Sequence, residues 1–163
     1  MFKYAIIIAS DKGSTGQRID GCIPVITATL PSEQYELVEG IILPDDQTTL
    51  ANHMIRMTDE LQVDLILTSG GTGFSVRDVT PEATKQVIHK EVPGFGEAMR
   101  AMSMAITSKA MLSRATAGIR NQTLIINLPG SPKAVKECLE FILQPLEHGL
   151  EIMIGSASEC ART

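Results

Sequence analysis

The sequence predicts an α/β protein with a mostly parallel sheet, and three observations support this prediction. Short, continuously apolar segments rich in β-branched residues alternate with segments of helical periodicity along most of the 163 residues. The apolar segments are too uninterrupted for a sheet with one wet face, so helices are expected on both faces. Polar loops follow several of the apolar segments, where ligands bind in parallel sheets.

The first part of the chain is predicted to form two strands with one helix between them. Lys3–Ala9 and Tyr35–Leu43 have the apolar, β-branched character of strands, and Pro44 ends the second of them. Ser10–Gly16 is rich in turn-forming residues and is expected to be a loop. Gln17–Leu30 is expected to be a helix.

The middle of the chain continues this alternation. Apolar residues recur at helical spacing after Asp45, so Asp46–Leu61 is predicted to be an amphipathic helix with Asp45 as its N-cap. Asp64–Thr68 reads as a third buried strand. The Thr80 hydroxyl is expected to cap a helix that begins at Pro81 and runs to about His89, because a capping residue followed by proline is typical of a helix start.

The last part of the chain is predicted to hold two helices and two strands. Pro93–Gly94 interrupts the helical pattern, and Gly96–Thr107 is expected to be a separate helix. Ala115–Ile119 and Thr123–Asn127 read as two strands joined by a short turn. Pro132 is expected to begin a final long helix with a clear apolar stripe.

Composition excludes several classes of protein. The length favours one domain over residues 1–163, and a net charge of −5 with a pI of about 5.2 argues against a nucleic-acid surface. The first apolar run is too short for a signal segment or a membrane span. The cysteines, Cys22, Cys138 and Cys160, form no close pair, as expected of reduced thiols in a cytoplasmic protein.

The predicted topology brings four polar loops together at one edge of the sheet. These loops are Ser10–Asp11, Pro44–Asp46, Ser69–Thr80 and Asn127–Pro132, and each follows a predicted strand. Because the carboxyl ends of parallel strands meet at one edge, we expect the loops to form a common ligand site.

The sequence Thr68-Ser-Gly-Gly-Thr-Gly73 is the most distinctive of these loops. Gly70, Gly71 and Gly73 allow close approach of the main chain to a ligand, and Ser69 and Thr72 add hydroxyl groups. A phosphate is the expected occupant, although a tight glycine turn without a ligand would have the same pattern. The loop lacks the Gly-Lys-Ser/Thr ending of a P-loop and the spacing of a dinucleotide fingerprint.

Acidic residues beside a phosphate site need a physical reason, because like charges repel. Asp45, Asp46 and Asp78 all fall in the predicted edge loops. A bound magnesium ion would account for them, since it takes one or two carboxylates together with phosphate oxygens. The alternative is that Asp45 and Asp78 only cap helices. Asp46, in the first turn of its predicted helix, is assigned no role in the site.

The glycine loop and its continuation resemble the MogA/MoaB family of molybdenum cofactor biosynthesis, which includes the G domains of gephyrin and its plant counterpart. The resemblance covers nearly the whole chain and rests on several spaced motifs. These are Ser10-Asp11, Pro44-Asp45, Gly70-Gly71-Thr72-Gly73 with Arg77-Asp78 and Thr80-Pro81-Glu82-Ala83, Pro93-Gly94-Phe95-Gly96-Glu97, Leu112-Ser113-Arg114, and Asn127-Leu128-Pro129-Gly130-Ser131-Pro132-Lys133-Ala134.

The resemblance implies a three-layer α/β/α sandwich and the adenylylation of molybdopterin with Mg-ATP, which releases pyrophosphate. Asp45 and Asp78 match the two carboxylates of the family, and they are the expected catalytic residues and Mg²⁺ ligands. The residues that match its nucleotide and pterin loops, or its motifs near them, are Ser10, Asp11, Ser69, Gly70, Gly71, Thr72, Gly73, Ser113, Arg114, Asn127, Pro129, Gly130, Ser131, Pro132 and Lys133.

The resemblance also implies partners and leaves alternatives open. A homotrimer is expected, and a hexamer is the other possibility. The Met- and Ala-rich segment Ala98–Met111 is expected to belong to the core, with a subunit interface as the second interpretation. The product would pass to a MoeA-type molybdate insertase. Arg77, Arg114 and Lys133 are candidate cations for the phosphates, with solvated surface charges as the alternative. A molybdopterin-binding protein without transferase activity is the second functional hypothesis. The segment Asp20-Gly21-Cys22 departs from the family pattern.

Overall fold

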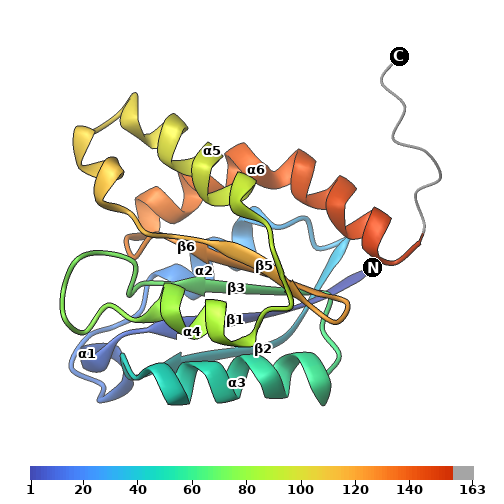
Figure 1. Cartoon of the computed structure of the whole chain (residues 1–163), viewed down its shortest axis with the longest axis horizontal. Coiled ribbons are helices and arrows are strands. Elements are labelled where there is room, and N and C mark those ends of the chain that lie inside the picture. Colours follow the sequence, from blue (N-terminus) through green and yellow to red (C-terminus); the bar gives the residue numbers. More distant parts are fainter. Residues whose placement is uncertain (156–163) are drawn as a thin grey trace.

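A six-stranded sheet forms the centre of residues 1–155, the part of the chain that the computed structural model describes (Figure 1). Residues 156–163, which include Cys160, lie outside the described residues. The strand order is β2-β1-β3-β6-β5-β4. The strands are β1 (Phe2–Ala9), β2 (Tyr35–Leu43), β3 (Leu65–Ser69), β4 (Lys90–Glu91), β5 (Ala117–Arg120) and β6 (Thr123–Leu128).

β2, β1, β3 and β6 run parallel to one another. β5 runs antiparallel to β6, and β4 runs antiparallel to β5. Thr68 of β3 is aligned with Ile7 of β1 on one side and with Asn127 of β6 on the other. β1, β2, β3 and β6 therefore end at the same edge. The loops that follow them meet there, at the left of Figure 1, as the sequence predicted.

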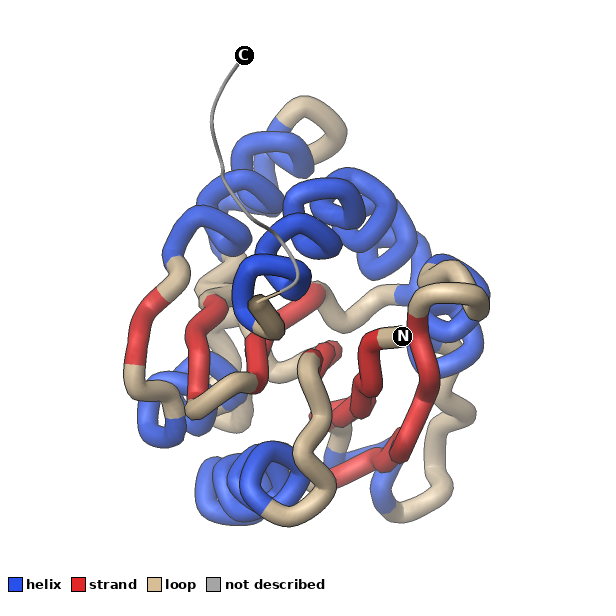
Figure 2. Tube along the Cα trace, turned by 90° about the vertical axis from the view of Figure 1, so that its right-hand side faces the viewer, coloured by secondary structure: helices blue, strands red, loops and turns tan. Residues whose placement is uncertain are grey.

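Helices cover both faces of the sheet, as Figure 2 shows in a view along the layers. α3 (Gln47–Asp59) and α4 (Thr80–Val87) pack on one face. α2 (Cys22–Thr29), α5 (Pro93–Met104) and α6 (Pro132–Met153) pack on the other. The short α1 (Asp11–Ser14) lies at the edge of the sheet, and the 3-10 helix η1 (Ser108–Leu112) follows α5. The predicted α/β/α sandwich is confirmed.

The central strands are buried on both faces, which explains their uninterrupted apolar sequence. Ile6 and Leu67 face the core beneath α6, whereas Ile7 and Ile66, their neighbours in the chain, face the core beneath α3 and α4. All four side chains have no exposed surface. This alternation divides the apolar residues between two cores and fixes the register of the central strands.

Two expected boundaries near the first loop are wrong. The segment after β1 forms the short helix α1 rather than a loop, because the Ser10 hydroxyl accepts a hydrogen bond from the Gly13 N–H at 3.0 Å and caps it. The next helix begins only at Cys22. Asp20 accepts hydrogen bonds from the N–H groups of Cys22 and Ile23, at 3.0 and 2.8 Å, and so holds the start of α2 there.

Two expected caps are also wrong. Asp46, not Asp45, caps α3, since its carboxylate accepts from the Thr49 N–H at 2.8 Å. The Thr80 hydroxyl does not cap α4 but donates to the Gly70 carbonyl at 2.9 Å. Asp45 and Thr80 are thus used for long-range contacts instead of local ones.

None of the helices in the described residues is long and apolar enough to cross a membrane. The expected single domain over residues 1–163 includes residues outside the described part, so it stays a prediction.

Candidate functional site

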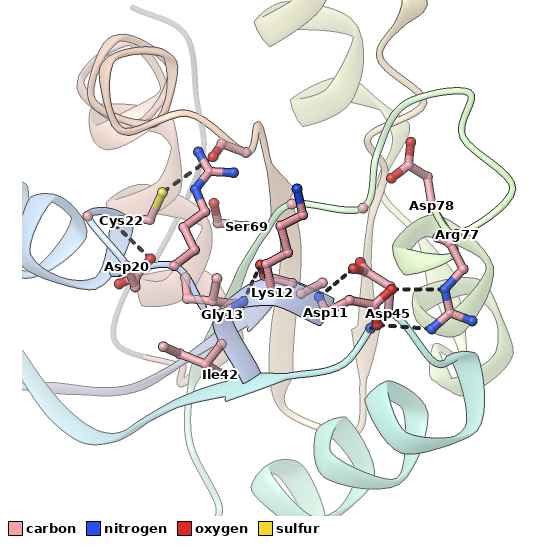
Figure 3. Close-up of a pocket in the computed structure, with 18 of the residues that line it drawn as sticks. Asp11, Lys12, Gly13, Asp20, Cys22, Ile42, Asp45, Ser69, Arg77 and Asp78 are labelled. Atoms are coloured by element: carbon pink, nitrogen blue, oxygen red, sulfur yellow. Dashed lines mark hydrogen bonds and ion pairs between the residues drawn. The ribbon is translucent and has the colours of Figure 1, made fainter. Parts of the chain in front are cut away.

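A pocket of about 680 Å³ lies at the edge where the four parallel strands end (Figure 3). Its walls come from the loops after β1, β2, β3 and β6 and from the segment that leads into α2. The residues proposed from the sequence that line it are Ser10, Asp11, Asp45, Ser69, Gly70, Gly71, Arg77, Asp78, Gly130 and Pro132. The topology therefore brings together residues that lie more than a hundred positions apart in the chain.

Asp11 and Asp45 are locked together at one end of this pocket. The Asp11 N–H donates to Asp45 Oδ2 and the Asp45 N–H donates to Asp11 Oδ1, both at 2.9 Å. Each carboxylate thus orients the main chain of the other loop. This pair fixes the loop after β1 against the loop after β2.

Arg77 reaches across from the glycine loop to the same pair. Its Nε and Nη2 atoms donate to the two oxygens of Asp11, both at 2.9 Å, in the bidentate geometry typical of arginine and carboxylate (Figure 3). The Arg77 guanidinium, together with the Asp45 N–H, lowers the pKa of Asp11 below its ordinary value. Asp11 therefore carries its negative charge at neutral pH, and Arg77 compensates that charge.

Asp45 has the opposite environment. Burial raises the pKa of Asp45, and the nearby negative charges of Asp11 and Asp78 raise it further, while the Asp11 N–H and Arg77 oppose the rise. Its Oδ1 atom accepts no hydrogen bond from any described residue. An anionic oxygen in this position is available to a cation.

Asp78 is the second acid at the glycine loop. Its Oδ2 accepts a hydrogen bond from the Ser75 N–H at 2.9 Å, and no described residue donates to its Oδ1. A Cβ atom on Gly73 would lie 2.9 Å from Asp78 Oδ2, so a glycine at this position leaves room for the carboxylate.

Two further glycines of the loop are required by its main-chain conformation. Gly70 and Gly71 have φ angles of 93° and 66°, which favour glycine. A Cβ on Gly70 would lie 2.4 Å from the Ala9 carbonyl oxygen, and one on Gly71 would lie 2.3 Å from Thr80 Oγ1 and 3.3 Å from Asp45 Oδ1. The loop thus runs directly beside β1 and beside Asp45.

The other end of the pocket combines polar and apolar groups. The Ser69 hydroxyl donates to the Pro129 carbonyl at 2.7 Å and ties the loop after β3 to the loop after β6. The Cys22 thiol donates to the Gly130 carbonyl with an Sγ···O distance of 3.6 Å, and burial raises its pKa. Cys22 is thus a neutral, packed part of the wall.

Sequence reasoning missed two cations of the pocket, Lys12 and Arg18. In Figure 3 the Lys12 side chain rises between Ser69 and Asp45. The position of Lys12 directly after Ser10-Asp11 was a usable signal, because that loop was already expected at the site. Arg18 carried no such signal, since it was assigned to a helix that does not form there.

Several residues proposed from the sequence lie outside the pocket lining. Asn127 is fully buried, where its amide donates to the hydroxyls of Thr68 and Thr84 at 3.0 and 2.8 Å. Lys133 is 83% exposed and pairs with Glu137. Ser131 caps α6. The others outside the lining are Thr72, Gly73, Ser113, Arg114 and Pro129.

The donor set fits magnesium bound together with phosphates. Asp45 and Asp78 each offer one carboxylate oxygen without a hydrogen-bond donor among the described residues. No group of three or more potential ligand side chains in residues 1–155 is arranged to hold a metal ion by itself. An ion here would therefore need oxygens from a bound substrate, which is the usual situation for magnesium.

Comparison with known proteins agrees with this geometry. Residues 5–148 match the family model described as "Probable molybdopterin binding domain". The chain belongs to this family. It is 42% identical over 153 residues to the molybdopterin adenylyltransferase of Helicobacter pylori strain J99, covering 93% of this chain and 87% of that protein. It is 43% identical over 141 residues to the molybdopterin adenylyltransferase of Escherichia coli strain K12, covering 85% and 72%.

A solved structure shows the same fold. The crystal structure of the molybdopterin biosynthesis enzyme MoaB from Thermus thermophilus superposes with a TM-score of 0.90 and 42% identity, over 95% of this chain and 98% of that one. The MogA/MoaB resemblance stated from the sequence is therefore confirmed.

Proposed function

We propose that this protein is a molybdopterin adenylyltransferase of molybdenum cofactor biosynthesis. It would transfer AMP from ATP to the terminal phosphate of molybdopterin and release pyrophosphate. The observation that supports this most directly is the pocket at the sheet edge, where a glycine loop, four aspartates and three cations meet, and where Asp45 and Asp78 each keep a carboxylate oxygen without a donor among the described residues. The chain is also 42% identical over 93% of its length to an enzyme with this name.

The reaction is an in-line displacement at phosphorus. An oxygen of the terminal phosphate of molybdopterin attacks the α-phosphorus of ATP, a new P–O bond forms, and the bond to the bridging oxygen of pyrophosphate breaks. The nucleophile is already an anion, so no general base is needed. The main obstacle is repulsion between the two phosphate-bearing substrates, and catalysis consists of positioning them and compensating their charge.

The residues of the pocket can do both. Lys12, Arg18 and Arg77 bring positive charge to the pocket walls. The main chain at Gly70 and Gly71 is open for close approach of a phosphate. Asp45 and Asp78 would hold Mg²⁺, which would supply further positive charge to the phosphate oxygens. We propose these residues as the substrate-contacting set.

The alternative of a molybdopterin-binding protein without transferase activity is less well supported. A site that only binds an anionic pterin gains nothing from two acids whose free oxygens face the phosphate loop, since like charges repel. The negative charge of Asp45 in particular destabilises the protein, because burial and two neighbouring acids disfavour the ionised form. A transferase that uses magnesium would need the charged carboxylate of Asp45 as a ligand of the ion, which accounts for a carboxylate at this unfavourable position.

We also propose the finer expectations that the resemblance implied, a cytoplasmic homotrimer that passes its product to a MoeA-type insertase. Large apolar side chains are exposed along the segment that includes the end of α5 and η1, namely Met104, Ile106, Met111 and Leu112. Such a group is typical of an interface. Met111→Glu should therefore give monomers by light scattering at micromolar concentration, with Val38→Glu on β2 as the control.

The activity is tested by incubating the protein with molybdopterin and Mg-ATP and measuring pyrophosphate release. ATP without molybdopterin is the control. Release that depends on molybdopterin, with formation of the adenylylated pterin, supports the proposal. Binding of molybdopterin with no pyrophosphate above the control would favour the binding-only alternative.

A further inference from the structure

Arg114 lies behind the glycine loop rather than in the pocket. Its main-chain N–H donates to the Thr72 carbonyl at 2.8 Å. Its Nε donates to the Gly73 carbonyl and its Nη2 to the Asp78 carbonyl, both at 2.7 Å. Its Nη1 forms an ion pair with Glu82 in the first turn of α4. Each of the three guanidinium nitrogens therefore has a partner within the protein.

These contacts fix both ends of the segment 73–78. Gly73 and Asp78 bound the stretch that carries Ser75 and Arg77, and all of these residues except Gly73 line the pocket. The guanidinium is a rigid, planar group with donors in fixed directions, so it holds the two carbonyls at a fixed separation. The position of the Asp78 main chain is thereby set from behind.

Glu82 in turn holds the guanidinium. One carboxylate oxygen of Glu82 pairs with Arg114, and the other, Oε2, is buried without a hydrogen-bond partner among the described residues. Arg114 is thus the cation that compensates this acid. Because Glu82 sits on α4, the pair connects the loop to a helix packed on the sheet.

We infer that Arg114 and Glu82 are positioning residues that set the geometry of Asp78 and of residues 73–78, and that Arg114 does not bind the phosphates. Arg114 cannot turn towards a ligand without releasing the carbonyls of Gly73 and Asp78 and leaving the Glu82 carboxylate without its cation. This replaces the expectation from sequence that Arg114 is a substrate cation. The effect of Arg114 and Glu82 on catalysis, as opposed to loop geometry, rests on the proposed function.

The test compares Arg114→Lys with Arg120→Lys. Arg120 is a matched control, because it also pairs with an acid, Asp59, and also donates to a main-chain carbonyl, that of Val87. It lies far from the pocket in the fold, at the opposite end of β5 and β6. Lysine keeps the charge but cannot donate to two carbonyls and a carboxylate in one plane.

We expect Arg114→Lys to lower kcat at least about tenfold, because a small displacement of an aligned group slows a positioned reaction strongly. The KM values for ATP and molybdopterin should change less than about threefold, since the pocket cations remain. The Mg²⁺ concentration for half-maximal rate should rise. Glu82→Gln should give the same pattern, and Arg120→Lys should leave all of these quantities within about twofold of wild type.

A second readout does not depend on activity. Hydrogen exchange of the amides of residues 74–80 should be faster in Arg114→Lys and Glu82→Gln than in the control, because the Ser75 and Asp78 amides are protected by bonds within this segment. If the wild type shows no transferase activity, the proposed function fails, and exchange still decides the positioning role. A raised KM for ATP with unchanged kcat, or wild-type exchange in both variants, would overturn the inference.

Discussion

Asp11 and Asp45 hold each other's main chain across 34 positions of sequence, with two N–H···O distances of 2.9 Å. Arg77, on a third loop, donates hydrogen bonds to both carboxylate oxygens of Asp11. The result is that Asp11 is fully engaged, whereas Asp45 keeps one oxygen without a donor among the described residues and has a raised pKa. Both acids therefore hold the two loops together, and only Asp45 keeps an oxygen that a ligand could use.

The first prediction concerns the two acids proposed to bind magnesium. Asp45→Asn and Asp78→Asn should each lower the adenylylation rate by at least roughly a hundredfold, the scale for loss of one preorganised charged group. The double variant should lose much less than the product of the two, because groups that act on one ion are not additive. Rates are measured against magnesium concentration.

Asp46→Asn is the matched control for this series. Asp46 is the next residue in the chain but caps α3, and asparagine caps a helix as well as aspartate does. Its rate should equal that of wild type. A wild-type rate in Asp45→Asn or Asp78→Asn would remove that residue from the site, and full multiplicative loss in the double variant would assign the two acids separate tasks.

The second prediction is a pH dependence of stability. The pKa of Asp45 is raised in the folded protein above its ordinary value of 3.8, so the folded state binds a proton more tightly than the unfolded chain does. The contribution of Asp45 to stability is therefore largest below the ordinary value and is lost as the pH rises through the folded pKa. At pH 7 the charged carboxylate destabilises the protein.

Asp45→Asn should accordingly raise the melting temperature at pH 7, and the gain should shrink as the pH falls towards the ordinary pKa of Asp45. Asparagine retains an oxygen that can accept from the Asp11 N–H. Magnesium with a non-hydrolysable ATP analogue should raise the melting temperature of wild type more than that of the variant. A variant less stable than wild type at pH 7 would contradict the assigned cost of this charge.

The third prediction separates two glycines of the pocket. Gly71→Ala should destabilise the protein, because its φ of 66° is unfavourable for alanine and the new Cβ would meet Thr80 Oγ1 at 2.3 Å. Gly130→Ala should fold normally, since its Cβ would lie 3.4 Å from the Gly70 Cα, an ordinary contact. The added methyl on the pocket wall should still weaken substrate binding about tenfold. Thermal melts and substrate affinities distinguish the two effects.

The fourth prediction concerns Asn127, which the sequence assigned to ligand binding. Asn127→Ala should lower the free energy of unfolding by about 3 kcal/mol, since it removes two side-chain hydrogen bonds from a fully buried site and leaves the Thr116 N–H without its carbonyl acceptor on this side chain. Ser131→Ala, which removes an exposed cap of α6, should cost only about 1 kcal/mol. Urea unfolding measures both values.

Ligand affinity completes this comparison. Measured under conditions where the Asn127→Ala variant is folded, its affinity for ATP should equal that of wild type, because Asn127 is not in the pocket lining. A large loss of affinity in the folded variant would restore Asn127 to the ligand site.

The sequence by itself determined five of the six strands, their helical cover and the edge of the sheet where the pocket lies, but it did not predict the two-residue strand β4. These follow from the local alternation of apolar strands with amphipathic helices, because a strand buried on both faces must be apolar throughout. The parallel order of β1, β2, β3 and β6 then places four loops together without any knowledge of individual contacts. The glycine loop could also be recognised from the sequence, because positive φ angles such as those of Gly70 and Gly71 favour glycine at those positions.

Only the tertiary structure decided which side chains serve the pocket and which serve the fold. Asp45 and Asp46 are equivalent as caps in sequence, and the Asp11 N–H, 34 positions away, draws Asp45 to the site. Arg114 was a plausible phosphate ligand until its partners, 32 to 41 positions away, were known. The physical reason is that a polar side chain forms its hydrogen bonds and ion pairs with the groups that surround it in the folded protein. Many of those groups come from distant segments, which are brought near only by folding.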